Sequence, residues 1–89
     1  MHSLTADRYW ECFRTLPKEI RKQAYEAYGQ FALDSFFPGL AFKEVNKLRH
    51  LWSVRVTRGY RAVGVREGDS ITWVWIGTHR EYEKFIAGR

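Results

Sequence analysis

The residues best suited to chemistry are the lysines, arginines and histidines in the second half of the chain, which can bind anions and exchange protons. The segment from Lys43 to Arg66 has seven Lys or Arg residues against a single acid, Glu44, while the whole chain of 89 residues has a net charge of +5. This segment alone therefore has a net charge of +6, and the rest of the chain is close to neutral. Such a concentration favours binding to a phosphate backbone or to an acidic protein; the alternative is a solvated basic surface without a target.

The segment 51–77 predicts three antiparallel strands joined by two turns. Apolar residues alternate with basic ones along most of it, and each of the two turns, at residues 57–59 and 68–69, contains a glycine. A three-residue loop with Gly59 in the left-handed conformation would place Val56 opposite Tyr60 and Arg55 opposite Arg61. A two-residue loop at residues 68–69 would then place Gly64 opposite Trp73, Val63 opposite Val74 and Ala62 opposite Trp75.

These registers assign the side chains of the three strands to two faces. The first face should receive helices, because large rings lie beside small partners there; it carries Trp52, Val54, Val56, Tyr60, Ala62, Gly64, Ile71, Trp73 and Trp75. The second face is an apolar floor with two arginines and is where we expect binding or chemistry; it carries Ser53, Arg55, Arg61, Val63, Val65, Thr72, Val74 and Ile76. Trp73 and Trp75 are accordingly interpreted as core and not as a platform for stacking bases.

The elements that position these strands can be predicted in chain order. Two helices over residues 6–16 and 17–33 have apolar stripes at helical spacing and should form a hairpin, with Ser3 or Thr5 as a cap for the first. A further strand is predicted over residues 40–45 and a short helix over 78–86, where Thr78 and Glu81 match a capping box. The predicted fold is α+β: an N-terminal helical hairpin packed on a four-stranded antiparallel sheet with a short C-terminal helix. We expect residues 1–89 to form one domain.

Composition narrows the class of protein further. The longest apolar runs fall short of a membrane span, and the first ten residues lack the apolar core of a signal peptide, so a cytosolic protein is expected. The single cysteine, Cys12, is compatible with neither an internal disulfide nor a cysteine-rich zinc site, and we interpret it as a small buried hydrophobe.

The order of these elements and three sequence segments resemble a known family. The segments are LPKEIRKQA (16–24), LWSVRVTRGYRAVGV (51–65) and WVWIGTHREYEKFI (73–86). Together they are similar to the RelE/ParE superfamily, the toxins of bacterial type II toxin–antitoxin pairs. Members of this superfamily usually open with a β-strand, and only residues 1–4 remain here to supply one.

The resemblance implies one of two activities. RelE-like members are ribosome-dependent mRNA endonucleases that use no metal or cofactor, whereas ParE-like members inhibit DNA gyrase. A solitary member that binds nucleic acid or protein and cleaves nothing is a third possibility. The expected partners are an antitoxin, with an acidic toxin-binding segment, and either mRNA and the ribosome or DNA gyrase.

The resemblance also implies roles for individual residues. The catalytic positions fall on Arg55, Arg61 and His79, with Tyr82 as the nearest match to a C-terminal tyrosine. A position that is often lysine falls on Ser53. The exposed cations expected to contact RNA are Lys43, Lys47, Arg49 and Arg58.

The side-chain types suit the implied chemistry. Arginines held on rigid strands can stabilise the negative charge that develops on a phosphate during cleavage, and histidine can exchange a proton near neutral pH. Simpler interpretations stay open for two positions: His79 as an ordinary residue at a helix start, and Tyr82 as a ring that packs over Val74 and Ile76.

Overall fold

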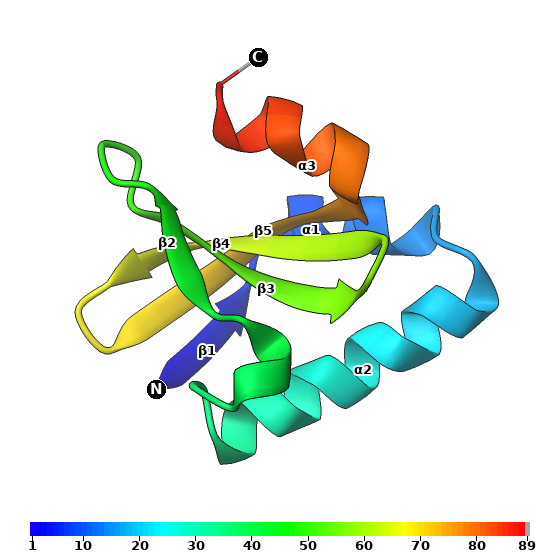
Figure 1. Cartoon of the computed structure of the whole chain (residues 1–89), viewed down its shortest axis with the longest axis horizontal. Helices are drawn as coiled ribbons and strands as arrows, with labels where there is room; N and C mark the ends of the chain where they lie inside the picture. Colours follow the sequence, from blue (N-terminus) through cyan, green and yellow to red (C-terminus); the bar gives the residue numbers. More distant parts are fainter. Residues whose placement is uncertain (89) are drawn as a thin grey trace.

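The computed structural model describes residues 1–88 and shows an α+β fold with a five-stranded mixed sheet (Figure 1). The helical elements are α1 (Asp7–Arg14), α2 (Lys18–Leu33), a 3-10 turn η1 (Pro38–Leu40) and α3 (His79–Ile86). The strands are β1 (His2–Thr5), β2 (Lys43–Asn46), β3 (Leu51–Thr57), β4 (Tyr60–Glu67) and β5 (Ser70–Thr78), in the spatial order β1-β5-β4-β3-β2. None of the helices in this described part of the chain has the length and apolar character needed to cross a membrane.

An N-terminal strand corrects the prediction of a four-stranded antiparallel sheet. β1 pairs in parallel with the first half of β5, whereas the other neighbouring strands are antiparallel. Its side chains also help to fix it, because the indole nitrogen of Trp73 donates to the Ser3 hydroxyl over 2.8 Å. Four residues are therefore enough to cover half of the β5 edge. The Thr5 hydroxyl accepts a hydrogen bond from Trp10, and the start of α1 has no side-chain cap, so the capping prediction for Ser3 or Thr5 is wrong.

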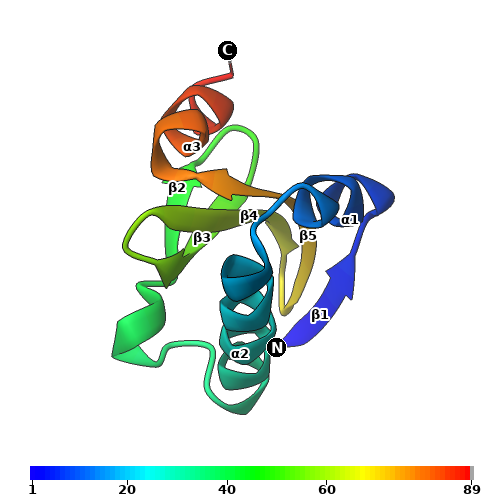
Figure 2. The ribbon, with the colours of Figure 1, turned by 90° about the vertical axis from the view of Figure 1, so that its right-hand side faces the viewer.

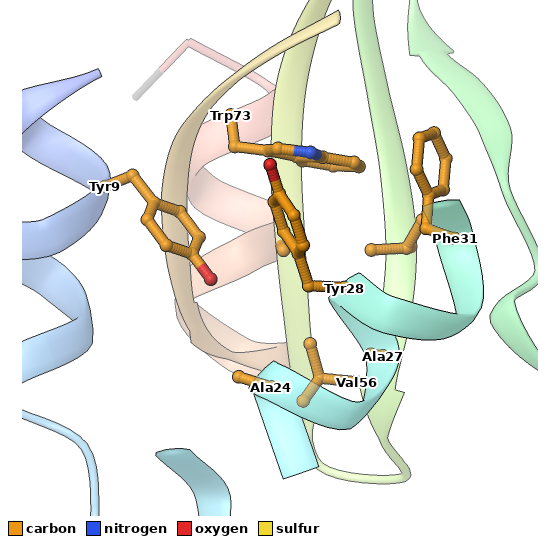
Figure 3. A pocket seen from close by; sticks show the side chains of 9 residues that line it. Tyr9, Ala24, Ala27, Tyr28, Phe31, Val56 and Trp73 are labelled. Atoms are coloured by element: carbon orange, nitrogen blue, oxygen red, sulfur yellow. The ribbon is translucent and has the colours of Figure 1, made fainter. Parts of the chain in front are cut away.

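The helices α1 and α2 pack against β5 and β3 and contribute to the core on the first face, as the sequence predicts, but they cross in direction and do not form the predicted hairpin (Figure 2). Buried residues of both helices join the tryptophan face in one core cluster, which includes Phe13, Phe31, Val54 and Trp73. Between α2 and the sheet a narrow cavity of about 20 Å³ remains, with room for roughly one water molecule. Figure 3 shows Tyr9, Tyr28 and Trp73 around it, with Ala24 and Ala27 of α2 on its floor.

A bulge in β5 overturns part of the predicted register. Gly64 lies opposite Trp73, as expected, but Val63 pairs with Trp75 and Ala62 with Ile76, because one extra residue of β5 is accommodated between these pairs. From this point on the faces of β5 are exchanged. Trp75 therefore lies on the second face and Ile76 in the first core cluster, the reverse of the prediction.

Two local predictions near β2 and β3 also change. The strand predicted over residues 40–45 begins only at Lys43, because η1 and a left-handed Ala41 (φ 46°) precede it. In the β3–β4 turn, Gly59 does not have a positive φ, and Thr57 instead of Val56 pairs with Tyr60. The register further along β3 and β4 is nevertheless the predicted one, including Arg55 opposite Arg61.

The second face is largely covered, which differs from the open floor that we expected. α3 lies on the side of the sheet opposite α2 (Figures 1 and 2). Its Tyr82 joins a second core cluster with Leu51, Val63 and Trp75. The predicted capping box of α3 is confirmed, since Thr78 and Glu81 exchange hydrogen bonds. What stays open on this face is the end nearest the β3–β4 turn.

Candidate functional site

The two arginines of the second face lie side by side at its open end. Arg55 of β3 is opposite Arg61 of β4, and Arg61 is in turn opposite Gly77 of β5. Because directly opposed residues of neighbouring strands share a face, both arginines project to the same side. Gly77 contributes no side chain, so the space beside Arg61 is left to the start of α3.

The guanidinium group of Arg61 is held by the turn that it follows. Its Nη1 donates to the carbonyl oxygens of Thr57, Tyr60 and Arg58 at 2.7, 3.0 and 3.2 Å. Burial lowers the pKa of Arg61 and the nearby charge of Arg55 lowers it further, while Tyr82 acts in the opposite direction. The group stays a cation, because an arginine pKa lies far above neutral pH. Arg55 is exposed and also borders a hollow between α2, η1 and the edge of β3, so its side chain is accessible from that edge as well.

His79 is the first residue of α3 and lies at the same end of the sheet. Its backbone N–H donates to the Gly59 carbonyl over 2.8 Å, which ties the helix start to the β3–β4 turn. Its Nδ1 lies 3.2 Å from a carboxylate oxygen of Glu83, one turn further along α3. A proton on Nδ1 would be donated to Glu83, leaving Nε2 to exchange a proton with a ligand.

Tyr82 lies under this group and not at its surface. The ring is 6% exposed, its centroid is 5.6 Å from that of His79, and its hydroxyl lies 3.0 Å from the hydroxyl of Ser53. The interpretation of Tyr82 as a packed residue is therefore confirmed, although its neighbours are Trp75 and Val63 and not Ile76. The ring of Tyr82 therefore packs against that of His79 from the buried side, between α3 and the sheet.

The cations predicted to contact RNA are exposed but lie in three different places. Lys43 is opposite Ser53 and so projects from the second face beside α3. Lys47 and Arg49 belong to the β2–β3 turn, and Arg58 to the β3–β4 turn next to Arg61. Arg49 has a further contact, because its Nη1 donates to the carbonyl oxygen of Phe85 near the end of α3.

The structure thus brings together Arg55, Arg61, His79 and Tyr82, with Arg58 on the adjacent turn. Lys43, Lys47 and Arg49 lie further away, on β2 and the β2–β3 turn. Two relationships were missed by sequence reasoning. The contact of His79 with Glu83 has the i,i+4 spacing of a helix and was open to prediction. The pairing of Ser53 with Tyr82 depends on how α3 docks, which no local pattern indicates.

Two cations and an imidazole at one end of a sheet form a group that can bind a phosphodiester and exchange a proton with it. Within residues 1–88 no cluster of three or more His, Cys, Asp or Glu side chains is arranged to hold a metal ion.

Comparisons with known proteins place this fold. The model of the ParE-like toxin domain family matches residues 18–84. Three similar solved structures are the RelB–RelE antitoxin–toxin complex from Methanococcus jannaschii (17% identity, 92% of this chain and 96% of that chain, TM-score 0.74), the YoeB/ParE toxin from Agrobacterium tumefaciens (13%, 89% and 99%, 0.68) and the YoeB dimer from Staphylococcus aureus (14%, 89% and 97%, 0.66). No curated protein matches the chain in sequence. The chain therefore belongs to the ParE-like toxin domain family, which confirms its assignment to the RelE/ParE superfamily of toxins.

Proposed function

We propose that this toxin is an endoribonuclease that cleaves mRNA on the ribosome and so inhibits translation. The observation that carries the proposal is the convergence of Arg55, Arg61 and His79 at the open end of the second face. Phosphodiester cleavage needs fixed positive charge and a group that moves protons, and this end of the molecule supplies both.

In the proposed reaction the 2′-hydroxyl oxygen of a nucleotide attacks the adjacent phosphorus. A bond forms between that oxygen and phosphorus, the bond from phosphorus to the 5′-oxygen of the next nucleotide breaks, and a 2′,3′-cyclic phosphate results. His79, held through Nδ1 by Glu83, takes the proton of the 2′-hydroxyl or supplies one to the leaving oxygen. Arg61, fixed by three carbonyl oxygens, and Arg55 stabilise the charge on the phosphate.

Tyr82 has a positioning role in this proposal. Its hydroxyl is engaged with Ser53 and its ring supports that of His79, so it holds the imidazole over the sheet. The exposed cations Lys43, Lys47, Arg49 and Arg58 would contact RNA phosphates on either side of the cleaved bond. No cofactor is part of the proposed reaction.

We also propose an antitoxin partner with an acidic toxin-binding segment. One similar structure is described as an antitoxin–toxin complex, and the surplus of cations on this chain suits an acidic partner. Covering the second face would block access of RNA to Arg55, Arg61 and His79 at the same time.

The test is expression of the chain in a bacterium while mRNA 5′ ends are mapped. The wild type should stop growth and create new ends within translated regions, and His79→Ala and Arg55→Gln should each reduce both effects at least tenfold. Arg80→Gln is the matched control, because it removes one exposed cation of α3 directly next to His79. Equal loss in all three variants would contradict the proposal. A wild type that creates no new mRNA ends would contradict it too.

The second candidate is inhibition of DNA gyrase, which the match to the ParE-like family model favours. That activity predicts an SOS response and loss of supercoiling, with little dependence on His79 and no new mRNA ends. A non-catalytic member, for which the serine at position 53 is the supporting observation, would leave growth unaffected at high expression.

A further inference from the structure

A second group of cations lies at the opposite end of α3 from His79. Arg8, from the first turn of α1, and Arg49, from the β2–β3 turn, both place their guanidinium groups over the ring of Phe85, at 5.1 and 5.7 Å from its centroid. These two arginines, Phe85 and Gly88 border a hollow of about 400 Å³. Segments that are 41 positions apart in the sequence thus meet at one surface feature.

The ring of Phe85 is a fixed support for this pair. One of its sides stacks on Trp75, with centroids 5.1 Å apart and planes inclined by 15°. Trp75 is buried in the second core cluster, so the ring cannot turn away without disturbing that cluster. The guanidinium groups are therefore held near each other by a rigid apolar surface, and their charges are left available to a ligand.

Internal contacts explain Arg49 in part but do not explain Arg8. The end of a helix has a negative partial charge, and here Asn46 donates to the Ile86 carbonyl over 2.8 Å while Arg49 donates to the Phe85 carbonyl over 3.1 Å. Arg8 has no hydrogen bond to the side chains or carbonyls of residues 1–88, and no carboxylate of those residues lies within 4.0 Å of its guanidinium group. Two like charges have been brought together there without an acid from the described chain.

We propose that this hollow binds a phosphate group of the nucleic acid strand whose other end occupies the Arg55–Arg61 site. The inference rests on the proposed ribonuclease function and extends its binding surface by one subsite. Lys43 lies on the same face between the two groups of cations, beside α3. α3 has eight residues and is about 12 Å long, so a strand laid along it needs only a few nucleotides to reach both ends.

A phosphate fits this place better than a stacked base does. The ring of Phe85 has Trp75 on one side and guanidinium groups within reach on the remaining surface, so a nucleobase has no free aromatic face on which to stack. Guanidinium groups offer several N–H donors in one plane, which suits phosphate oxygens. Arg49 uses one nitrogen for Phe85 and retains the others.

The test measures binding and not cleavage, so that it separates this subsite from the proposed reaction. A fluorescent single-stranded RNA with 2′-O-methyl groups cannot undergo 2′-hydroxyl attack but keeps its phosphates. Its affinity for the purified chain is measured by anisotropy over a series of salt concentrations. Arg8→Gln is the variant and Arg80→Gln the matched control, since both remove one exposed arginine from a helix and Arg80 lies outside the hollow.

Arg8→Gln should weaken binding about three- to tenfold at low salt and reduce the slope of log affinity against log salt by roughly 0.7, the value for one phosphate contact of a single strand. Arg80→Gln should change the slope by much less. Equal changes in the two variants would show that only net charge matters and would overturn the subsite. Arg8-dependent binding of a polyglutamate peptide in place of the RNA would overturn it too, because the ligand would then be an acidic protein.

A second measurement keeps the two proposals distinguishable. Inorganic pyrophosphate is titrated into the isotope-labelled chain, and the amide signal of Gly88 should move in the wild type and stay still in Arg8→Gln. That result would support the subsite even if mapping of mRNA ends showed no cleavage. Arg8-independent movement of Gly88 would contradict the subsite even if cleavage were found.

Discussion

The hydroxyl groups of Ser53 and Tyr82 lie 3.0 Å apart between the centre of the sheet and the C-terminal helix. Ser53 is 2% exposed and Tyr82 6% exposed, so neither group can turn to water when the other is removed. The pair fixes α3 on β3, and α3 holds His79 next to Arg61. A position where the family resemblance suggests a lysine has thus become part of the support of the site.

Removal of both hydroxyls should therefore cost less than the two single removals added together. Tyr82→Phe leaves the Ser53 hydroxyl buried without a partner, and Ser53→Ala does the same to Tyr82, each at about 1–3 kcal/mol of unfolding free energy. The double variant should be more stable than the sum of the two effects predicts, by about 1 kcal/mol. Urea denaturation of the four proteins measures this, and strict additivity would show that the two hydroxyl groups are not coupled.

The two arginines should differ in what they do for the fold. Arg61→Ala removes the donor to three carbonyl oxygens of the β3–β4 turn and should lower the unfolding free energy by about 1–2 kcal/mol. Arg55→Ala removes an exposed side chain and should change it by less than about 0.5 kcal/mol. Thermal denaturation checks both. Loss of activity in Arg55 variants would then report on charge, whereas in Arg61 variants it would include loosening of the turn.

Sequence reasoning predicted the parts of the fold that depend on local pattern. The alternation of β3 and β4 predicted Arg55 opposite Arg61, a register that holds because an irregularity between Arg55 and Thr57 offsets the error in the predicted turn. The box of Thr78 and Glu81 predicted the start of α3. Both signals act over a few residues, and neither depends on what packs above them. The pair of arginines at the core of the candidate site was consequently predicted correctly.

What failed depends on contacts between distant segments. The bulge in β5 lets Trp75 face α3, and alternation alone cannot show where one extra residue is accommodated. The pairing of β1 with β5 is a match between residues 2–5 and 70–73, so four residues without a clear pattern became a strand only through their partner. The contact of Ser53 with Tyr82 could not be predicted for the same reason, because it exists only once α3 packs on β3.

Two glycines should respond in opposite ways to substitution by alanine. Gly29 lies inside α2 with no atom within 4 Å of a built Cβ, so Gly29→Ala should stabilise the fold by about 1 kcal/mol through helix propensity. At Gly64 a Cβ would meet Ile71 Cγ1 at 2.7 Å and the Thr72 carbonyl oxygen at 3.0 Å. Gly64→Ala should therefore destabilise it by about 1–3 kcal/mol. Chemical denaturation measures both, and a tolerant Gly64 would mean that β4 and β5 can separate at this point.

The buried hydroxyl of Tyr9 should make the fold sensitive to alkaline pH. Burial, together with the charges of the neighbouring Tyr25 and Tyr28, raises the pKa of Tyr9 to about 12. In the unfolded chain the phenol ionises near pH 10, so the unfolded state binds fewer protons than the folded state between about pH 10 and 12. Stability from this group is thus fully present below about pH 10 and is lost as the pH rises towards 12.

The expected loss is at most about 2–3 kcal/mol, since each unit of pKa difference corresponds to about 1.4 kcal/mol. Tyr9→Phe should remove this part of the pH dependence, and Tyr60→Phe, whose phenol is not among the groups that shift Tyr9, should leave it in place. Unfolding free energies of the three proteins at pH 8, 10 and 11.5 test the assignment. The same decline with pH in Tyr9→Phe as in the wild type would show that the phenol of Tyr9 is not its source.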